Sequence, residues 1–213
     1  MKSADIAALR KEYAKALLNE HTVLRNPLEQ FSVWLDEAVA ASLPEPTAMA
    51  LASVNDGGAP SVRMVLLKGV DHGFVFYTNY NSRKGTELLG NHNTALLFFW
   101  PELERQVRIE GIVEKSTAEE STAYFDSRPR DSRIGAHASA QSSVIQSREE
   151  LDEHYALLHA RFDQQDIPRP DTWGGFRVIP HTIEFWQGRP SRLHDRLRFR
   201  KQNDDWLLER LSP

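Results

Sequence analysis

The 213-residue sequence contains no cysteine. This absence excludes disulfide bonds, thiolate metal sites and a cysteine nucleophile, and it is compatible with a reducing compartment. The longest strongly apolar run, residues 95–100, is far too short to span a bilayer, and residues 1–5 lack the apolar stretch of a signal peptide. We therefore expect a cytoplasmic protein without a membrane partner.

The sequence signatures of several common sites are missing as well. No Gly-x-Gly-x-x-Gly follows a strand-like segment and no P-loop is present, so two frequent nucleotide sites are unsupported. The eight histidines show no His-Glu-x-x-His or similar spacing, and we expect no metal. With 26 basic and 30 acidic residues the net charge is -4, which disfavours a globally basic nucleic-acid-binding protein.

Apolar periodicities divide the chain into short elements. Asn26 and Pro27 suit a helix N-cap and a first helical position, and residues 55–58 (Asn-Asp-Gly-Gly) are a hairpin signal. Many short antiparallel strands with inserted helices predict a β-barrel of the α+β class. The predicted helices are residues 4–18, 27 to the prolines at 44 and 46, 84–89, 117–126 and 148–164, and the predicted strands are 47–54, 61–70, 73–78, 94–100, 105–115, 175–179, 182–187, 193–201 and 206–211.

Residues 192–200 are the most unusual segment. At the two-residue period of a strand, one face carries five basic groups: Arg192, His194, Arg196, Arg198 and Arg200. Such groups repel one another unless water or an anion screens them, so two interpretations stay open, a solvated outer face and an anion site. Neighbouring arginines should lower the pKa of His194, which suits a neutral hydrogen-bonding or proton-accepting role.

Two further basic clusters suit phosphate. Arg63 and Lys68 lie on a mostly apolar strand, and Arg83 and Lys84 begin a helix, whose N-terminal amides and dipole favour anions. Residues 124–133 combine three arginines, two serines and a tyrosine near a helix end, a set that suits a phosphate monoester. Ordinary basic helix ends and a polar loop with local salt bridges are the alternative interpretations.

Nine segments, taken in order, resemble the pyridoxamine 5'-phosphate oxidase family. The resemblance runs from Arg10 to Pro213, and the order and spacing of so many motifs argue against chance. The segments are Arg63-Met64-Val65-Leu66-Leu67-Lys68, Phe76-Tyr77-Thr78-Asn79, Ser82-Arg83-Lys84, Glu104-Arg105-Gln106-Val107, Ser127-Arg128-Pro129-Arg130-Asp131-Ser132, Gln141-Ser142-Ser143, Trp173-Gly174-Gly175-Phe176-Arg177, Glu184-Phe185-Trp186-Gln187-Gly188 and Arg192-Leu193-His194-Asp195-Arg196.

The resemblance implies an FMN-binding split β-barrel that forms a homodimer with FMN at the subunit interface. It implies oxidation of pyridoxamine 5'-phosphate and pyridoxine 5'-phosphate to pyridoxal 5'-phosphate, with O2 as electron acceptor and H2O2 as product. Residues 26–213 would form the barrel domain. Residues 1–25 would form an N-terminal helical segment, and in this family the N-terminal segment can close over the substrate.

Carried over motif by motif, the resemblance implies three sets of site residues. Arg192 and His194 would be catalytic and would face the substrate ring. The substrate would also be bound by Arg10, Tyr13, Lys68, Tyr124, Arg128, Ser132 and Leu193. FMN would be held by Arg63, Met64, Val65, Leu66, Leu67, Lys68, Tyr77, Thr78, Arg83, Lys84, Gln106, Gln141, Ser142, Trp186 and Arg196.

Two positions depart from the family pattern. Asn26 stands where the family often has aspartate before proline, and residues 137–140 are atypical. Three other functions stay open: an FMN oxidase of the related phenazine-biosynthesis type, a non-catalytic carrier of flavin or pyridoxal phosphate, and a nucleic-acid-binding protein. The phosphate-suited residues 127–132 argue against the first, and the acidic net charge argues against the last.

Overall fold

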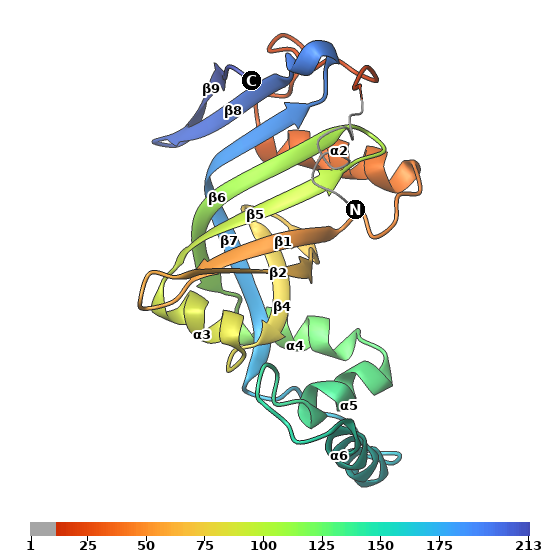
Figure 1. Ribbon diagram of the computed structural model, residues 1–213. Coiled ribbons are helices and arrows are strands. Elements are labelled where there is room, and N and C mark those ends of the chain that lie inside the picture. Colours follow the sequence, from red (N-terminus) through yellow and green to blue (C-terminus); the bar gives the residue numbers. More distant parts are fainter. Residues whose placement is uncertain (1–11) are drawn as a thin grey trace, which may run out of the picture. The chain divides into compact units, whose positions relative to one another are not determined.

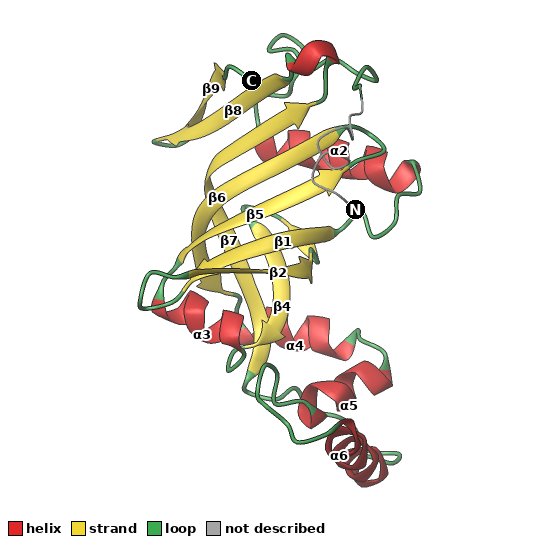
Figure 2. Cartoon of the chain, in the orientation of Figure 1, coloured by secondary structure: helices red, strands yellow, loops and turns green. Residues whose placement is uncertain are grey.

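The computed structural model describes residues 12–213, whose elements are labelled in Figure 1 and coloured by type in Figure 2. The helices are α2 (Pro27–Ala40), α3 (Arg83–Gly90), α4 (Ala118–Asp126), α5 (Arg130–Ala138), α6 (Arg148–Arg161) and the short 3-10 helix η1 (Pro190–Arg192). The strands are β1 (Ala48–Val54), β2 (Pro60–Leu66), β3 (Gly69–Val70), β4 (Phe74–Asn79), β5 (Asn93–Trp100), β6 (Arg105–Lys115), β7 (Trp173–Gln187), β8 (Asp195–Gln202) and β9 (Asp205–Arg210).

Local sequence signals set the helix starts. The Asn26 side chain accepts a hydrogen bond from Leu28 N at the start of α2, and Ser82 Oγ accepts one from Gly85 N at the start of α3. Thr117 and Glu120 form a reciprocal capping box at the start of α4. Side-chain oxygens thus satisfy amides that lack a partner within the helix, and the three predicted starts are confirmed to within one residue.

One sheet contains all nine strands of the described part of the chain. Its order is β2-β1-β5-β6-β7-β4-β3, with β8 paired to β7 and β9 to β8. Strand β7 pairs antiparallel with β4 from Phe74↔Val178 to Asn79↔Trp173, and antiparallel with β8 from Thr182↔Arg200 to Gln187↔Asp195. The predicted α+β class with an antiparallel sheet is confirmed.

The chain divides into two compact units, each with its own apolar cluster. In the unit formed by residues 1–49, 96–110 and 180–213, Phe31 of α2 packs against Phe98, and Trp34 packs edge-on against Phe185. The unit formed by residues 50–95 and 111–179 groups α4, α5 and α6 beside the start of β7 (Figure 1). Its buried cluster consists of Phe125, Ile134, Phe162, Ile167 and Trp173.

Residues 12–19 form a loop, so the predicted helix at residues 4–18 is wrong over its described part. Ala14 N and Lys15 N both donate to Glu104 Oε2, at 2.9 and 3.0 Å, and Leu18 N donates to Asp195 Oδ2 at 3.2 Å. These long-range bonds replace the i to i−4 bonds that a helix would make. Residues 4–11 lie outside the described residues.

The start of the basic strand is also corrected. Strand β8 begins only at Asp195, because Ser191 and Arg192 have φ angles of 57° and 61°, in the left-handed region, and turn the chain before the strand. Arg192 and His194 therefore precede the strand and do not share a strand face with Arg196.

Three further elements differ from prediction. The single strand β7 replaces two predicted strands, at residues 175–179 and 182–187, and the predicted strand at 61–70 is divided into β2 and β3. Helix α5 occupies a segment for which we predicted no helix. Its buried face consists of only Ile134 and Ala138, four residues apart, which is too short a pattern to distinguish a helix from a polar loop.

Candidate functional site

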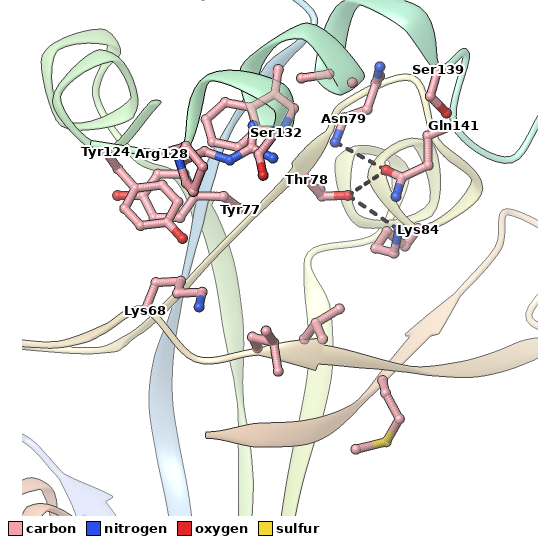
Figure 3. A pocket seen from close by; sticks show the side chains of 17 residues that line it. Lys68, Tyr77, Thr78, Asn79, Lys84, Tyr124, Arg128, Ser132, Ser139 and Gln141 are labelled. Atoms are coloured by element: carbon pink, nitrogen blue, oxygen red, sulfur yellow. Dashed lines mark hydrogen bonds between the residues drawn. The ribbon is translucent and has the colours of Figure 1, made fainter. Parts of the chain in front are cut away.

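A cavity of about 670 Å³ lies in the unit formed by residues 50–95 and 111–179 (Figure 3). Its walls come from β2, the segment that joins β2 to β3, β4, the first turn of α3, the end of α4, α5 and the first residue of β7. The lining residues are Met64, Val65, Leu66, Lys68, Tyr77, Thr78, Asn79, Lys84, Tyr124, Arg128, Pro129, Ser132, Gly135, Ala136, Ser139, Gln141 and Trp173.

The cavity lining is cationic. Among the described residues it contains three cations, Lys68, Lys84 and Arg128, and no carboxylate. Arg128 Nη1 is buried without a hydrogen-bond partner within the described part of the chain, and burial lowers the pKa of this guanidinium. A buried donor that lacks an acceptor is costly, so this arrangement favours an anionic ligand that supplies the missing acceptor.

A hydrogen-bonded corner closes one side of the cavity. Thr78 Oγ1 donates to Gln141 Oε1 at 2.9 Å, Asn79 N donates to the same oxygen at 3.2 Å, and Lys84 Nζ donates to Thr78 Oγ1 at 3.2 Å (Figure 3). Lys84 is 8% exposed, and its burial, together with the charge of Arg63, lowers the pKa of its ammonium group. The corner therefore holds a desolvated lysine beside two polar groups.

Aromatic rings form a second wall. The rings of Tyr77 and Tyr124 stack with centroids 4.0 Å apart, and the Trp173 ring lies within 10° of parallel to both. The Arg128 guanidinium carbon lies 4.7 Å from the centre of the Trp173 ring. Flat aromatic faces beside cations suit a planar ligand that carries negative charge.

Helix α3 itself carries a buried carboxylate. Glu87, 6% exposed, accepts hydrogen bonds from Ser53 Oγ at 2.6 Å and Ser61 Oγ at 2.5 Å, and it pairs with Arg83 and Arg63. The terminal nitrogens of Arg63 also donate to Leu51 O, Ser53 Oγ and Ser61 Oγ. The four terminal N–H groups of Arg63 thus face this cluster, and Arg63 does not line the cavity.

Replacing Glu87 with glutamine is expected to lower the free energy of unfolding by about 3 kcal/mol near pH 7, because two arginines lose a buried charged partner. Burial raises the pKa of the carboxyl, but the hydrogen bonds outweigh it and lower that pKa from 4.5 to about 2. A carboxyl with a depressed folded-state pKa stabilises the fold above its unfolded pKa. The difference between the two proteins in urea unfolding should therefore shrink as the pH falls from about 4.5 to about 2.

Glu209 provides the matched control for this variant. It bridges Arg198 and Arg200 on the β8–β9 hairpin, and its own side chain is 29% exposed, against 6% for that of Glu87. Glu209→Gln should change stability much less, because exposed ion pairs contribute little. Equal losses in the two variants, or a Glu87→Gln loss that persists unchanged at pH 2, would contradict the account of Glu87.

The other unit holds a small aromatic group around His194. The His194 ring lies 4.6 Å from the Trp186 ring and 5.8 Å from the Tyr13 ring, and His194 Nδ1 accepts a hydrogen bond from Arg189 N at 3.1 Å. Burial, and then the charge of Arg192, lowers the pKa of His194, as predicted. The imidazole is therefore neutral near pH 7, and because Nδ1 accepts, its proton lies on Nε2.

Arg196, Arg198 and Arg200 have carboxylate partners that neither interpretation of the basic strand considered. Arg196 forms a two-pronged pair with Glu184, at 2.8 and 3.1 Å, while Arg198 and Arg200 both contact Glu209. Carboxylates on β7 and β9 therefore screen these arginines. Considering one strand without its neighbours could not reveal these partners.

The structure brings many of the predicted site residues together at the cavity. Eleven line it: Met64, Val65, Leu66, Lys68, Tyr77, Thr78, Lys84, Tyr124, Arg128, Ser132 and Gln141. In the same unit, Arg63, Leu67, Arg83 and Ser142 do not line it, and Ser142 lines a second cavity. The other unit contains Tyr13, Gln106, Trp186, Arg192, Leu193, His194 and Arg196. Arg10 lies outside the described residues.

Six cavity residues had no predicted role: Asn79, Pro129, Gly135, Ala136, Ser139 and Trp173. Trp173 lies in a segment that carries the family resemblance, but tryptophan at a strand start is also an ordinary core residue. Ser139 belongs to the atypical segment 137–140 and gives no signal of its own. Only the tertiary structure places these side chains beside Arg128 and Gln141.

Two family models match the chain. The pyridoxamine 5'-phosphate oxidase model matches residues 35–160, and the model of the pyridoxine 5'-phosphate oxidase C-terminal dimerisation region matches residues 173–213. A curated pyridoxine/pyridoxamine 5'-phosphate oxidase from a Polaromonas species is 60% identical over 211 residues, covering 98% of this chain and 97% of the relative. Its counterpart from Burkholderia thailandensis is 57% identical and covers 98% and 99%.

Two solved structures share this fold. PhzG from Burkholderia lata, in complex with tetrahydrophenazine-1-carboxylic acid, has a TM-score of 0.89 and 32% identity, covering 94% of this chain and all of PhzG. A pyridoxamine 5'-phosphate oxidase-related, FMN binding protein from Nostoc punctiforme has a TM-score of 0.72 and 14% identity, covering 90% and 100%, and shows the fold alone.

Fold and cavity together define a split-barrel protein with a cationic cavity. The two family models and the near full-length identity to curated relatives make the assignment more specific. The chain belongs to the pyridoxamine 5'-phosphate oxidase family.

In the described part of the chain, every helix is too short or too polar to cross a membrane.

Proposed function

We propose that this protein oxidises pyridoxamine 5'-phosphate and pyridoxine 5'-phosphate to pyridoxal 5'-phosphate, with FMN as cofactor, as the last step in making that product. The alcohol loses two hydrogens to O2, giving the aldehyde and H2O2. The amine additionally takes up one water and releases ammonia. The observation that carries the proposal is the cavity itself, which presents three cations and no carboxylate in a chain 60% identical to a curated oxidase of this name.

The cavity residues fit FMN. A phosphate needs cations and donors, and Lys84 is buried and donates to the Thr78 hydroxyl, which in turn donates to the Gln141 amide oxygen. We propose that Lys84, Thr78 and Gln141 bind FMN together with Tyr77 and residues 64–68. The proposed set of FMN-binding residues also includes Arg63, Arg83, Ser142, Gln106, Trp186 and Arg196. Bound FMN supplies the two-electron acceptor that protein side chains lack.

The substrate phosphate is assigned to the other end of the cavity. We propose that Arg128 donates to it through the unpartnered Nη1, with Lys68, Tyr124 and Ser132 as further ligands. A small dianionic phosphate held by charge-assisted bonds fixes the position of the ring to which it is attached. The remaining substrate contacts are assigned to Arg10, Tyr13, Arg192, Leu193 and His194.

The protein forms a homodimer, which the match of residues 173–213 to a dimerisation region supports. We propose that a second copy brings Gln106, Trp186 and residues 192–196 to the FMN and the substrate. Oligomeric state measured at increasing dilution, in parallel with activity, tests this: activity should disappear with the dimer. We also propose that the enzyme works in the cytoplasm, which cell fractionation would test.

Arg192 and His194 are the proposed catalytic residues. His194 is neutral near pH 7, and Arg192 is exposed beside it, so either can contact the hydroxyl or amine of the substrate. Positioned acids and bases of this kind accelerate proton transfer when they lie within hydrogen-bond reach of the proton.

The pH dependence of kcat/KM tests the role of His194. Because the pKa of His194 is lowered from 6.5, activity that needs the neutral imidazole should persist below pH 6.5 and then fall as the pH drops further. A His194→Asn variant should lose this acidic limb. An unchanged acidic limb in the variant would remove His194 from the proposed catalytic pair.

A non-catalytic carrier and a phenazine-type oxidase are the competing functions. The purified protein should be yellow and should release peroxide on addition of pyridoxine 5'-phosphate, whereas a carrier would bind without releasing peroxide. The structural similarity to PhzG keeps the second alternative in view. Competition between tetrahydrophenazine-1-carboxylic acid and pyridoxal 5'-phosphate for the protein separates the two, and we expect the phosphorylated ligand to bind more tightly because the cavity presents three cations.

A further inference from the structure

We infer that Trp173 is a positioning residue that holds Arg128 in place for the substrate phosphate and thereby sets the preference for phosphorylated ligands. The inference rests on the proposed function, since it assumes that Arg128 binds that phosphate. Trp173 itself is assigned no contact with the reacting atoms.

Trp173 is a rigid support. Its side chain is 7% exposed and belongs to the buried cluster with Phe125 and Ile134. Its backbone is fixed as well, because Trp173 pairs with Asn79 at the end of the β4–β7 ladder and its N–H donates to Pro170 O. A ring held by both core packing and a strand ladder has few alternative positions.

Arg128 lies outside the strand ladder, and its N–H donates to Phe125 O at 3.1 Å. It lies between the end of α4 and the start of α5. In the described part of the chain no carboxylate pairs with it, although it is half-buried. Its contacts are with ring faces: the guanidinium carbon lies 4.7 Å from the Trp173 ring centre and 5.7 Å from that of Phe125. An arginine held by rings keeps its charge and its N–H donors available for a ligand.

The unpartnered Nη1 of Arg128 is available to a ligand in the cavity. A carboxylate partner would hold Arg128 equally well, but it would occupy the N–H groups and repel a phosphate. The ring support leaves Nη1 buried without an acceptor, and Arg128 lines the cavity with Lys68 and Ser132 (Figure 3). Trp173 therefore acts on the phosphate through Arg128.

The test compares two ligands that differ only in phosphate. Equilibrium titration of the FMN-loaded protein with each ligand gives two Kd values, and the ratio compared is the Kd for pyridoxal divided by the Kd for pyridoxal 5'-phosphate. In Trp173→Met, we expect the Kd for the phosphorylated ligand to rise about three- to thirtyfold, the range that a desolvated cation–π contact allows. The Kd for pyridoxal should change less than about twofold, so the ratio falls. Trp173→Phe, which retains a weaker ring face, should give an intermediate ratio and serves if the methionine variant does not fold.

Two controls make the outcomes distinct. Trp206→Met removes a tryptophan that also lies under a cation, Lys201, but outside the cavity, and it should leave the ratio unchanged. Arg128→Ala tests the assumption itself. If Arg128→Ala lowers the ratio and the Trp173 variants weaken both ligands equally, the inference is overturned while the proposed function stands. If wild-type protein shows no preference for the phosphorylated ligand, the proposed function fails.

Discussion

Arg192→Ala should retain bound FMN and lose most of its turnover, by about 10²- to 10⁴-fold in kcat, the range for a positioned proton-transfer group. Arg192 is exposed, sits in a left-handed turn just before β8, and lies close enough to His194 for its charge to lower the histidine pKa. FMN should remain because most of the residues proposed to bind it lie on or beside α3, β2 and β4. The measurements are flavin absorbance of the purified variant and initial rates with pyridoxine 5'-phosphate.

Arg200→Ala is the matched control for this variant. Arg200 is an exposed arginine of the same segment, paired with Glu209, and no family motif includes it. It should keep wild-type turnover. Normal turnover in Arg192→Ala with flavin bound would remove Arg192 from the catalytic site, and loss of flavin in that variant would assign it a binding role instead.

Arg128→Ala should raise KM for both phosphorylated substrates roughly 10- to 100-fold, as expected when a charge-assisted hydrogen bond of about 1.5–3 kcal/mol is lost. Nη1 of Arg128 is buried without an acceptor in the described part of the chain, so a phosphate there would gain a bond at little cost in competing contacts. The effect should be mainly on KM, because the phosphate is bound equally in the ground state and the transition state. Initial rates over a range of substrate concentrations measure it.

Arg148→Ala removes an equivalent charge from an exposed position on α6, where the arginine pairs with Asp152. Its KM should match that of wild type, which would exclude a general effect of net charge. A KM unchanged in Arg128→Ala would place the substrate phosphate elsewhere, and a fall in kcat alone would indicate that Arg128 acts in the chemical step.

Much of the fold could be predicted because its signals are local. The cap at Asn26, the helix predicted at residues 117–126 and the alternation in β6 depend on neighbouring residues only, and these elements were confirmed. The failures involve distant partners. Residues 12–18 are held by Glu104 and Asp195 instead of by their own helical bonds, and nothing in their apolar spacing reveals this.

At the candidate site, too, motifs within one segment could be predicted, and contacts between distant segments could not. Motif resemblance grouped Lys68, Tyr124, Arg128 and Ser132, and all four line one cavity. It could not foresee that carboxylates on neighbouring strands pair with Arg196 and Arg198, since strand register is not written in a single strand. Nor could it foresee the aromatic wall, because Tyr77, Tyr124 and Trp173 come from three separate elements.

The most direct test of the central claim is oxygen uptake by the FMN-loaded protein with pyridoxine 5'-phosphate and with pyridoxamine 5'-phosphate. The account predicts uptake with both, one pyridoxal 5'-phosphate and one H2O2 for each O2 consumed, and ammonia only from the amine. It also predicts that the unphosphorylated alcohol and amine are poor substrates, because they cannot engage Arg128 and Lys68. No uptake with either phosphorylated compound by protein that retains FMN would contradict it.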